Sequence, residues 1–352
     1  MTDILKIHGK KKMRERVKLS IVCITYNHAR FIRDALNGFV MQKTNFPFEI
    51  LVHDDASTDG TADVIREYEA KYPDLFRCVY QTENQWGKKD PCKDFLFPMV
   101  QGKYVALNEG DDYWTDENKL QKQVDFMELH PDFSVCFHPV IVHWDDDSRT
   151  DTVFPTKKER FNKTVLTLDD LLKHNFIQTN SVVYRWRFHQ DSLNLVPRNI
   201  LPGDYFLHLL HAQVGKIGFL NDVMSVYRRH RGGIWTEAEQ TPQWYARCGV
   251  ASVRFWSEIQ QSFSCDCLDK MKEVAVLTKV CLQNADKEDA LEELMAVCPD
   301  MPDFPRFIRL KILLYSLMIP FMFGEARKKI RRQKRFLKKF IKFGENSYGK
   351  QN

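Results

Sequence analysis

The alternation of short apolar runs with helical runs over residues 18–107 constrains the fold of this chain more than any other feature. Residues 18–25 (KLSIVCIT) and 48–54 (FEILVHD) are rich in apolar and β-branched side chains, a pattern typical of strands buried on both faces. Helical patterns follow these runs at 27–39 and 61–71. The alternation continues with a strand at 76–80, a helix at 92–100 and a strand at 104–107. This order predicts an α/β fold with a mostly parallel sheet, right-handed crossovers and helices on both faces.

The rest of the chain changes character in steps. A helix at 118–130 and a strand at 133–143 precede a polar linker, 145–163, which we expect to form a mobile loop. Shorter mixed elements follow, including a helix at 204–214, and the pattern beyond residue 236 is predominantly helical. We therefore divide the chain into an N-terminal extension (1–16), an α/β domain (17–235), a helical C-terminal region (236–324) and a basic tail (325–352).

Composition indicates a folded intracellular protein. The 352 residues are 43% apolar and 12% aromatic, which is enough to bury a large core. The longest apolar stretch, 312–324, is shorter than the roughly 17 to 25 residues that span a bilayer, and the N-terminus lacks the apolar core of a signal peptide. Nine cysteines without a Cys-x-x-Cys pair predict reduced, mostly buried thiols. We expect a cytoplasmic chain without a transmembrane helix.

Polar residues gather where the predicted strands end. The run 25–27 (Thr-Tyr-Asn) follows the first strand, 54–60 (DDASTDG) follows the second, and 109–112 (Glu-Gly-Asp-Asp) follows the fourth. In open parallel α/β sheets the ligand lies beyond the carboxyl ends of the strands, where such loops collect. We expect the functional site at this edge.

The acidic turn at 109–112 supplies two adjacent carboxylates, Asp111 and Asp112. Mg²⁺ and Mn²⁺ prefer oxygen ligands and are commonly bound through one or two carboxylates together with phosphate oxygens and waters. The sequence offers no Gly-rich loop opening a helix that would cradle phosphates in another way. A solvated turn, or a cap for the next helix, is the alternative interpretation of the pair.

Three runs in order carry a resemblance to a known family. Residues 19–27 (LSIVCITYN), 54–61 (DDASTDGT) and 102–114 (GKYVALNEGDDYW) resemble the family 2 glycosyltransferases of the GT-A fold, of the type that builds bacterial cell-surface polysaccharides. The resemblance covers residues 17–235 and implies a GT-A-like catalytic domain. It also implies an inverting transfer of a sugar from a nucleotide-diphosphate donor, a UDP-sugar by default, to a hydroxyl of a glycan or lipid-linked acceptor.

The resemblance implies roles for the residues that bind the donor nucleotide. Thr25, Tyr26 and Asn27 would line the nucleoside pocket. Asp55 would accept the ring N–H of the base and discriminate between bases, because an unmatched buried acceptor is costly. The following pair, Asp59-Gly60, would cap the helix that begins after it.

At the acidic turn the resemblance implies a divalent cation, Mn²⁺ or Mg²⁺. Asp112 would be its direct ligand, and Asp111 would lie near the ribose or the metal. Members of the family usually carry an Asp-x-Asp pattern at this place. Here the sequence has the variant Glu109-Gly110-Asp111-Asp112.

Asp204 is the candidate general base that takes the proton from the acceptor hydroxyl. The run 202–207 (PGDYFL) resembles the acidic motif that opens an acceptor-side helix in the family, although Gly203 stands where an acidic residue is common. The alternative is that Asp204 only caps the helix.

Residues 226–233 (VYRRHRGG) resemble the closing segment of the family, whose basic side chains approach the diphosphate or the metal. We expect Arg228 and Arg229 near the donor diphosphate, because Arg forks match phosphate geometry. His230 is expected as a further metal ligand, since a neutral imidazole can bind Mn²⁺. A solvated loop is the alternative for these three residues. Trp114 is a candidate floor for a donor or acceptor sugar ring, with burial in the core as its alternative.

The tail is strongly basic. Residues 325–342 contain ten Lys or Arg against one Glu, although the whole chain carries only +5. Apolar residues recur on the same segment at helical spacing, so it predicts a basic amphipathic helix able to lie on an anionic membrane surface. We expect peripheral attachment to the inner face of the cell membrane; packing on the catalytic domain is the alternative. Nucleic-acid binding is not expected, because no platform of stacking aromatic residues accompanies the charge.

The sequence thus favours a metal-dependent hexosyltransferase, with two rivals. A sugar-nucleotide nucleotidyltransferase shares a nucleotide-binding α/β architecture but normally has a Gly-rich phosphate loop near its N-terminus, where this chain has Thr25-Tyr26-Asn27-His28. A non-catalytic membrane- or glycan-binding scaffold of the same fold is the second. The helical C-terminal region could also mediate a homo-oligomer.

Overall fold

The computed structural model describes residues 16–156, 165–233, 235, 241–263 and 265–299 of the chain. It divides into two compact units. The first comprises Met1–Asn199 and Asp204–His230, and the second comprises Ile200–Gly203 and Arg231–Asn352. The predicted membrane-binding segment, 325–342, lies outside the described residues, as does the N-terminal extension up to residue 15.

The larger sheet of the first unit has eight strands among the described residues, in the order β3-β2-β1-β4-β10-β6-β11-β9. Their bounds are β1 (Leu19–Thr25), β2 (Phe48–Asp54), β3 (Phe76–Tyr80), β4 (Tyr104–Glu109), β6 (Phe133–Phe137), β9 (Val165–Leu166), β10 (Val183–Arg185) and β11 (Lys216–Phe219). The four strands from β3 to β4 are parallel, and β10 runs antiparallel to both β4 and β6. The loops after β1, β2, β3 and β4 therefore meet at one edge of the sheet.

A smaller sheet has the order β5-β12-β7-β8. Its strands are β5 (Tyr113–Trp114), β7 (Val140–Trp144), β8 (Thr152–Phe154) and β12 (Ser225–Arg229). β5 follows the acidic turn directly, and β12 pairs with it through Ser225 and Val226. This pairing brings the segment around residues 228–230 to the acidic turn, more than a hundred residues earlier in the chain.

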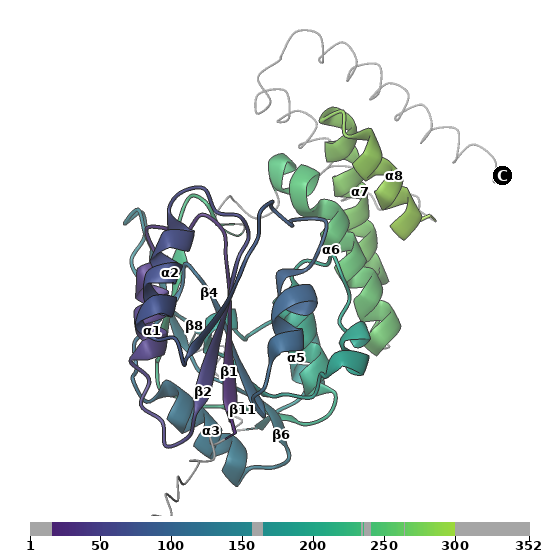
Figure 1. Ribbon diagram of the computed structural model, residues 1–352. Coiled ribbons are helices and arrows are strands. Elements are labelled where there is room, and N and C mark those ends of the chain that lie inside the picture. The colour runs from purple at the N-terminus through teal and green to yellow at the C-terminus, as the bar shows by residue number, and fades with distance from the viewer. Residues whose placement is uncertain (1–15, 157–164, 234, 236–240, 264, 300–352) are drawn as a thin grey trace, which may run out of the picture. The chain divides into compact units, whose positions relative to one another are not determined.

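Helices cover both faces of the larger sheet (Figure 1). On one face, apolar side chains of β1, β2 and β4 pack with three helices: α1 (Ile32–Val40), α2 (Thr61–Lys71) and α3 (Lys119–Leu129). On the other face lie the one-turn π-helix η1 (Pro91–Leu96), whose Phe95 ring contacts His53 of β2, and α5 (Gly203–Ala212), whose His208 contacts Tyr184 of β10. The remaining short elements are η2 (Phe97–Met99), α4 (Leu168–Lys173), η3 (Thr179–Ser181) and η4 (Gln190–Leu195).

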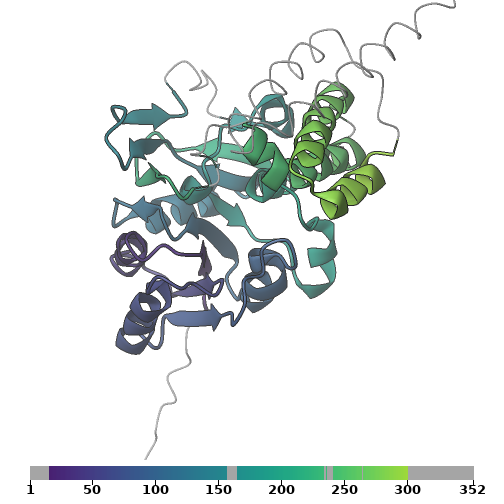
Figure 2. The ribbon, with the colours of Figure 1, turned by 90° about the horizontal axis from the view of Figure 1, so that it is seen from above.

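The second unit is helical in its described part. α6 (Pro242–Phe263), α7 (Leu268–Asn284) and α8 (Glu288–Val297) lie side by side and share an apolar core (Figures 1 and 2). α6 and α7 approach closely at Gly249, where an added Cβ would lie 2.2 Å from Thr278 Oγ1. Among the described residues, no helix combines the length and the apolar character needed to cross a membrane.

The predicted fold class, an α/β domain followed by a helical region, is confirmed. Several predicted elements differ from the structure. β8 lies within the stretch expected to form a mobile loop, and the helix expected at 92–100 consists of the π-helix η1 and the 3-10 helix η2. Two further differences have local reasons. The strand expected at 133–143 breaks at His138-Pro139 into β6 and β7, which belong to different sheets, because proline has no N–H for a sheet ladder. The helix expected at 27–39 begins at Ile32, because Asn27 adopts a left-handed conformation (φ 55°) and turns the chain.

Candidate active site

The acidic turn packs against the loop after β1 through Gly110. The Gly110 N–H donates to the carbonyl of Ile24 at 2.9 Å. A Cβ at Gly110 would lie 2.6 Å from Thr25 Oγ1 and 3.0 Å from His28 Nδ1, closer than real Cβ atoms come to such neighbours. Glycine is therefore required for the turn and the β1 loop to come this close.

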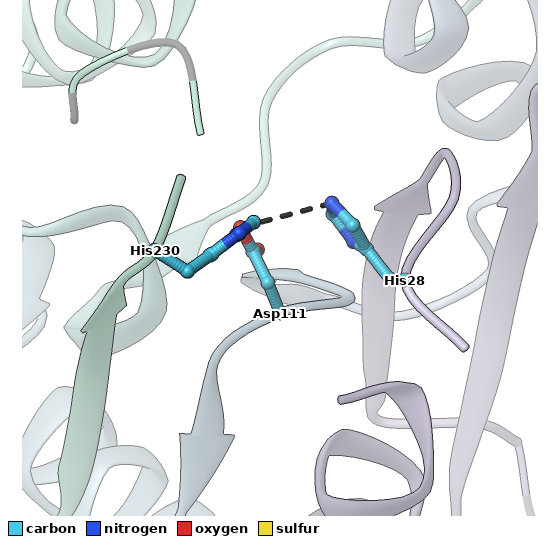
Figure 3. Close-up of side chains that lie close together, drawn as sticks. All are labelled: His28, Asp111 and His230. Atoms are coloured by element: carbon cyan, nitrogen blue, oxygen red, sulfur yellow. Dashed lines mark hydrogen bonds and ion pairs between the residues drawn. The ribbon is translucent and has the colours of Figure 1, made fainter. Parts of the chain in front are cut away.

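Three side chains that can bind a cation converge at the turn: His28, Asp111 and His230 (Figure 3). One ligand atom from each lies within 4.8 Å of the others. The distance to Asp111 Oδ2 is 2.9 Å from His230 Nε2 and 3.7 Å from His28 Nε2. In an octahedral ion with ligands at about 2.0–2.1 Å, neighbouring ligand atoms lie about 3 Å apart. The 2.9 Å distance matches this spacing, and the 3.7 Å distance is longer. The three side chains form a candidate cation site, which we call the cation end of the site.

Asp111 has spare ligand capacity for such an ion. Its Oδ1 is buried and has no hydrogen-bond partner among the described residues. A buried carboxylate oxygen without a partner is costly unless a ligand satisfies it. The residues present therefore fit a divalent cation.

Asp112 faces a different environment. Its side chain is fully buried, and its Oδ1 accepts a hydrogen bond from the backbone N–H of Arg228 at 2.8 Å. Its carbonyl accepts one from Asn108 Nδ2 at 3.0 Å. Asp112 thus joins the turn to β12. Its Oδ2, like Asp111 Oδ1, is buried without a hydrogen-bond partner among the described residues. Asp111 is the carboxylate beside the two imidazoles, and the role of Asp112 as a metal ligand stays a prediction.

The carboxyl groups of the turn differ in pKa. Burial raises the pKa of Glu109 to about 8, with further contributions from the charges of Asp111 and Asp204. Burial also raises the pKa of Asp112 well above its usual range, and the charges of Asp111 and Glu109 add to this. For Asp111, burial alone would raise the pKa, but His28 and His230 reverse the effect and lower it. Asp111 is therefore the carboxylate that is ionised most readily.

The two imidazoles are held by the surrounding loops. The backbone N–H of His28 donates to Thr61 Oγ1 at 2.8 Å, which anchors the residue to the start of α2. The ring of His230 lies against Phe31, with ring centroids 4.6 Å apart. Burial lowers the pKa of His28, against the opposing charge of Asp111. A neutral imidazole is the form that binds metals.

Arg228 stabilises the acidic turn through its guanidinium group. Its guanidinium donates to the carbonyl of Asp111 and to the carboxylate of Asp34, both at 2.9 Å, and lies over the rings of Phe31 and Tyr113. The side chain is buried, so these contacts make it a structural support of the turn. The guanidinium of Arg229 lies over the Trp144 ring, 5.3 Å from its centroid. That the two arginines approach the donor diphosphate stays a prediction.

Trp114 belongs to the core. Its side chain is buried, and its indole N–H donates to the carbonyl of Asn180 at 2.9 Å. The ammonium of Lys119 lies 4.1 Å from the ring centroid, and Phe39 packs edge-on against the ring. The structure therefore gives Trp114 the packing role and offers no face of its ring to a sugar.

The loops after β1 and β2 form one hydrogen-bonded unit. Asn27 Oδ1 accepts from the Thr58 N–H at 2.8 Å, and the Asn27 N–H donates to Ser57 Oγ at 2.9 Å. Asp59 accepts from the N–H groups of Ala29 and Thr61, so it joins the start of α2 to the β1 loop, while the N-cap residue of α2 is Gly60. Thr25 is buried beneath this unit.

Asp55 and Tyr26 occupy the outer part of these loops. The Asp55 N–H donates to the carbonyl of Thr25 at 3.0 Å, and its Oδ1 accepts from the Gln85 N–H at 2.8 Å. The Asp55 side chain is half-buried, and burial raises its pKa. Tyr26 is 44% exposed. We call Tyr26, Asp55 and the neighbouring Trp86 the nucleoside end of the site.

Asp204 lies in the first turn of α5, and its Oδ2 accepts a hydrogen bond from Thr179 Oγ1 at 2.6 Å. Its charge contributes to the raised pKa of Glu109, which places it electrostatically near the acidic turn. Asp204 is thus a half-buried carboxylate oriented by a hydroxyl, and its role as the general base stays a prediction.

The sequence patterns assign no role to His28 or to Trp86. His28 directly follows the Thr-Tyr-Asn run, but a predicted helix over 27–39 assigns it no role at the strand edge. Trp86 follows β3 in a stretch without a motif. Its position, just after the third of four parallel strands, is the signal that could have marked it.

Comparison with solved structures identifies the fold. The crystal structure of Staphylococcus aureus TarS 1–349 in complex with UDP-GlcNAc superposes with a TM-score of 0.51 and 19% identity, covering 93% of this chain and 92% of that chain. At this identity the likeness concerns the fold, which is the GT-A fold of glycosyltransferases.

Sequence comparison supports the same class. Residues 20–190 match the family model described as Glycosyl transferase family 2. An uncharacterized protein of Mycobacterium tuberculosis is 49% identical over 220 residues, which are 62% of this chain and 61% of that protein. The putative teichuronic acid biosynthesis glycosyltransferase TuaG of Bacillus subtilis is 33% identical over 109 residues, 31% of this chain and 41% of that protein. The chain thus spans about three fifths of the mycobacterial relative.

Proposed function

We propose that this chain is an inverting glycosyltransferase that moves a sugar from a nucleoside-diphosphate donor to an acceptor hydroxyl. The observation that carries the proposal is the convergence of His28, Asp111 and His230 at the strand edge where family 2 enzymes are expected to bind their donor. The β1 and β2 loops, which carry Tyr26 and Asp55, lie at the same edge. A nucleotide and a cation thus have adjacent places.

The donor diphosphate would be bound with a divalent cation, Mn²⁺ or Mg²⁺, held by Asp111, His230 and His28. Such a cation neutralises the charge that develops on the leaving diphosphate. The chain's own contribution is to fix the three ligand atoms: Gly110 lets the turn meet the β1 loop, and Arg228 supports the turn through the Asp111 carbonyl.

Asp204 is proposed as the general base. Its carboxylate would take the proton of the acceptor hydroxyl while the hydroxyl oxygen bonds to the anomeric carbon and the bond from that carbon to the diphosphate breaks. Thr179 would hold the carboxylate through the hydrogen bond to Oδ2. Asp204→Asn should keep donor binding and lose turnover by at least about 100-fold; unchanged turnover would remove Asp204 from the mechanism.

A UDP-sugar donor and a glycan or lipid-linked acceptor of surface polysaccharide synthesis are the substrates we propose. The names of two relatives support this class: TuaG is a putative teichuronic acid biosynthesis glycosyltransferase, and TarS of S. aureus is a poly(ribitol-phosphate) β-N-acetylglucosaminyltransferase. A lipid-linked acceptor would also fit attachment of the basic segment 325–342 to an anionic inner membrane surface. Flotation with anionic vesicles, with and without residues 325–352, tests that attachment.

Donor hydrolysis is the direct test of the proposed function. The full-length protein, incubated with a panel of UDP- and GDP-sugars and Mn²⁺, should release nucleoside diphosphate from one donor, and EDTA should stop the release. Formation of labelled nucleoside triphosphate and sugar 1-phosphate from labelled pyrophosphate and a nucleotide sugar would instead indicate a nucleotidyltransferase. Binding of a glycan without turnover of any donor would indicate a scaffold.

A further inference from the structure

Trp86 is a large aromatic side chain that the described structure leaves 55% exposed. It lies on the loop after β3, and this loop is fixed to Asp55. The Gln85 N–H donates to Asp55 Oδ1 at 2.8 Å, and Asn84 Nδ2 donates to the Asp55 carbonyl at 3.4 Å. The Trp86 N–H in turn donates to Asn84 Oδ1 at 3.0 Å. Gln85, the residue before Trp86, thus contacts Asp55 directly.

A second exposed aromatic residue is linked to Asp55 through its neighbour in the chain. Tyr26 is 44% exposed, and its neighbour Thr25 accepts the Asp55 N–H at 3.0 Å. Two exposed aromatic residues are thus each adjacent in the chain to a hydrogen-bond partner of Asp55. An acceptor for a ring N–H on loops that carry exposed aromatic residues suits a flat heterocycle, because aromatic faces stack on any base.

The order of the strands indicates which part of the donor meets Trp86. The loops that carry Trp86, Asp55 and Asp111 follow β3, β2 and β4, and the sheet order is β3-β2-β1-β4. Neighbouring strands are about 4.8 Å apart, so the end of β3, from which the Trp86 loop starts, lies about 14 Å from the end of β4. An extended nucleoside diphosphate spans such a distance. With its diphosphate at the cation end, its base reaches the β2 and β3 loops, and the sugar lies beyond the diphosphate, away from Trp86.

We propose that Trp86 is a donor-binding residue that stacks on the nucleobase whose ring N–H Asp55 accepts. This inference rests on the proposed function, because it places a nucleoside diphosphate at the strand edge. Trp86 adds affinity for the nucleoside and leaves the cation end unchanged. The residue acts on the base alone, so its loss affects UDP and a UDP-sugar equally.

Calorimetric titration of the full-length protein with UDP, and separately with GDP, in the presence of Mn²⁺ tests the proposal. For the nucleotide that the wild type binds, Trp86→Ala should weaken binding about tenfold, and Trp86→Phe less than about threefold, because phenylalanine keeps an aromatic face. Leu129→Ala removes another exposed apolar side chain, at the end of α3, and should bind as the wild type does. Circular dichroism of each variant confirms that it folds.

Tryptophan fluorescence provides the second measurement. Stacking on a base should quench Trp86, so the quenching that the nucleotide causes in the wild type should be lost in Trp86→Phe and kept in Trp256→Phe, a change in the helical second unit. Wild-type affinity in Trp86→Ala would overturn the proposal. A loss seen with a UDP-sugar but not with UDP would overturn it in favour of a sugar contact. If the wild type bound neither UDP nor GDP, the proposed function itself would fail, and this inference with it.

Discussion

The cation end and the nucleoside end of the site are built in opposite ways. At the cation end, Asp111 is buried, and its neighbours His28 and His230 come from segments about two hundred residues apart. At the nucleoside end, Tyr26 and Trp86 are 44% and 55% exposed, and the hydrogen bonds join loops that follow neighbouring strands. The cation end thus depends on the packing of the whole first unit, whereas the nucleoside end depends on hydrogen bonds between neighbouring loops. Changes at the cation end should therefore have larger and less localised effects.

Gly110→Ala should break the cation end and have the largest effect. The added methyl group would lie 2.6 Å from Thr25 Oγ1 and 3.0 Å from His28 Nδ1, so the turn and the β1 loop must separate. We expect Mn²⁺ affinity to fall at least about 100-fold, because misplaced ligand atoms no longer share one ion. Electron paramagnetic resonance of free Mn²⁺ measures this. Gly203→Ala, where a methyl group meets no atom within 4 Å, should not lower the melting temperature. Unchanged Mn²⁺ affinity in Gly110→Ala would show that the close approach does not matter.

Asp55→Asn should weaken the nucleoside end and leave the cation end intact. The amide oxygen can still accept the Gln85 N–H, but the NH₂ group then opposes the N–H of the base, and a hydrogen bond to a charged acceptor is lost. UDP affinity should fall about 10- to 30-fold, with Mn²⁺ affinity measured without nucleotide unchanged. Asp63→Asn, an exposed change on α2, is the matched control. An equal loss of Mn²⁺ affinity would contradict the separation of the two ends.

Glu109 should make the stability of the cation end depend on pH. Its pKa is about 8 in the folded protein and about 4.3 in an unfolded chain. Between these values the folded state binds a proton that the unfolded state does not, so the free energy of unfolding falls as pH rises. Glu109→Gln lacks this titration. The melting temperature of Glu109→Gln minus that of the wild type, both measured in EDTA, should increase by about 2 °C or more from pH 5.5 to pH 8. A constant difference would show that Glu109 is ionised throughout.

Asp34→Asn should have the smallest effect. Asp34 pairs with Arg228 at 2.9 Å, but its side chain is half exposed, and such pairs contribute about 0–1 kcal/mol. Arg228 keeps its contact with the Asp111 carbonyl and its packing on Phe31. Mn²⁺ affinity and transfer rate should change by less than about threefold. A tenfold loss would mean that the turn depends on this surface pair.

Local residue patterns in the sequence predict part of the fold. The strands from β1 to β4 read as apolar runs because parallel strands are buried on both faces, and the polar turns after them mark the edge of the sheet. The orientation of Asp111 and Asp112 is not local. It depends on the pairing of β12 with β5, which lets the Arg228 N–H bind Asp112 and leaves Asp111 to the imidazoles.

The same distinction explains the two residues that the sequence did not reveal. His28 reaches the cation end because Asn27 turns the chain with φ 55° before α1 begins, whereas the residue types predict a helix there. Trp86 is placed by the bond from Gln85 to Asp55, a contact between two loops without regular structure. Side-chain contacts between distant loops leave no periodic signal in a sequence.

The most direct test of the claim that Asp111 presents its carboxylate to the cation is Mn²⁺ binding by two variants, Asp111→Asn and Asp112→Asn. Electron paramagnetic resonance measures the binding of both side by side. Asparagine at 112 can still accept the Arg228 N–H and resembles the protonated carboxyl that burial favours there. The Mn²⁺ affinity of Asp111→Asn should fall at least about 100-fold, and that of Asp112→Asn should stay within about threefold of the wild-type affinity. The reverse order would contradict the claim and assign the cation to Asp112.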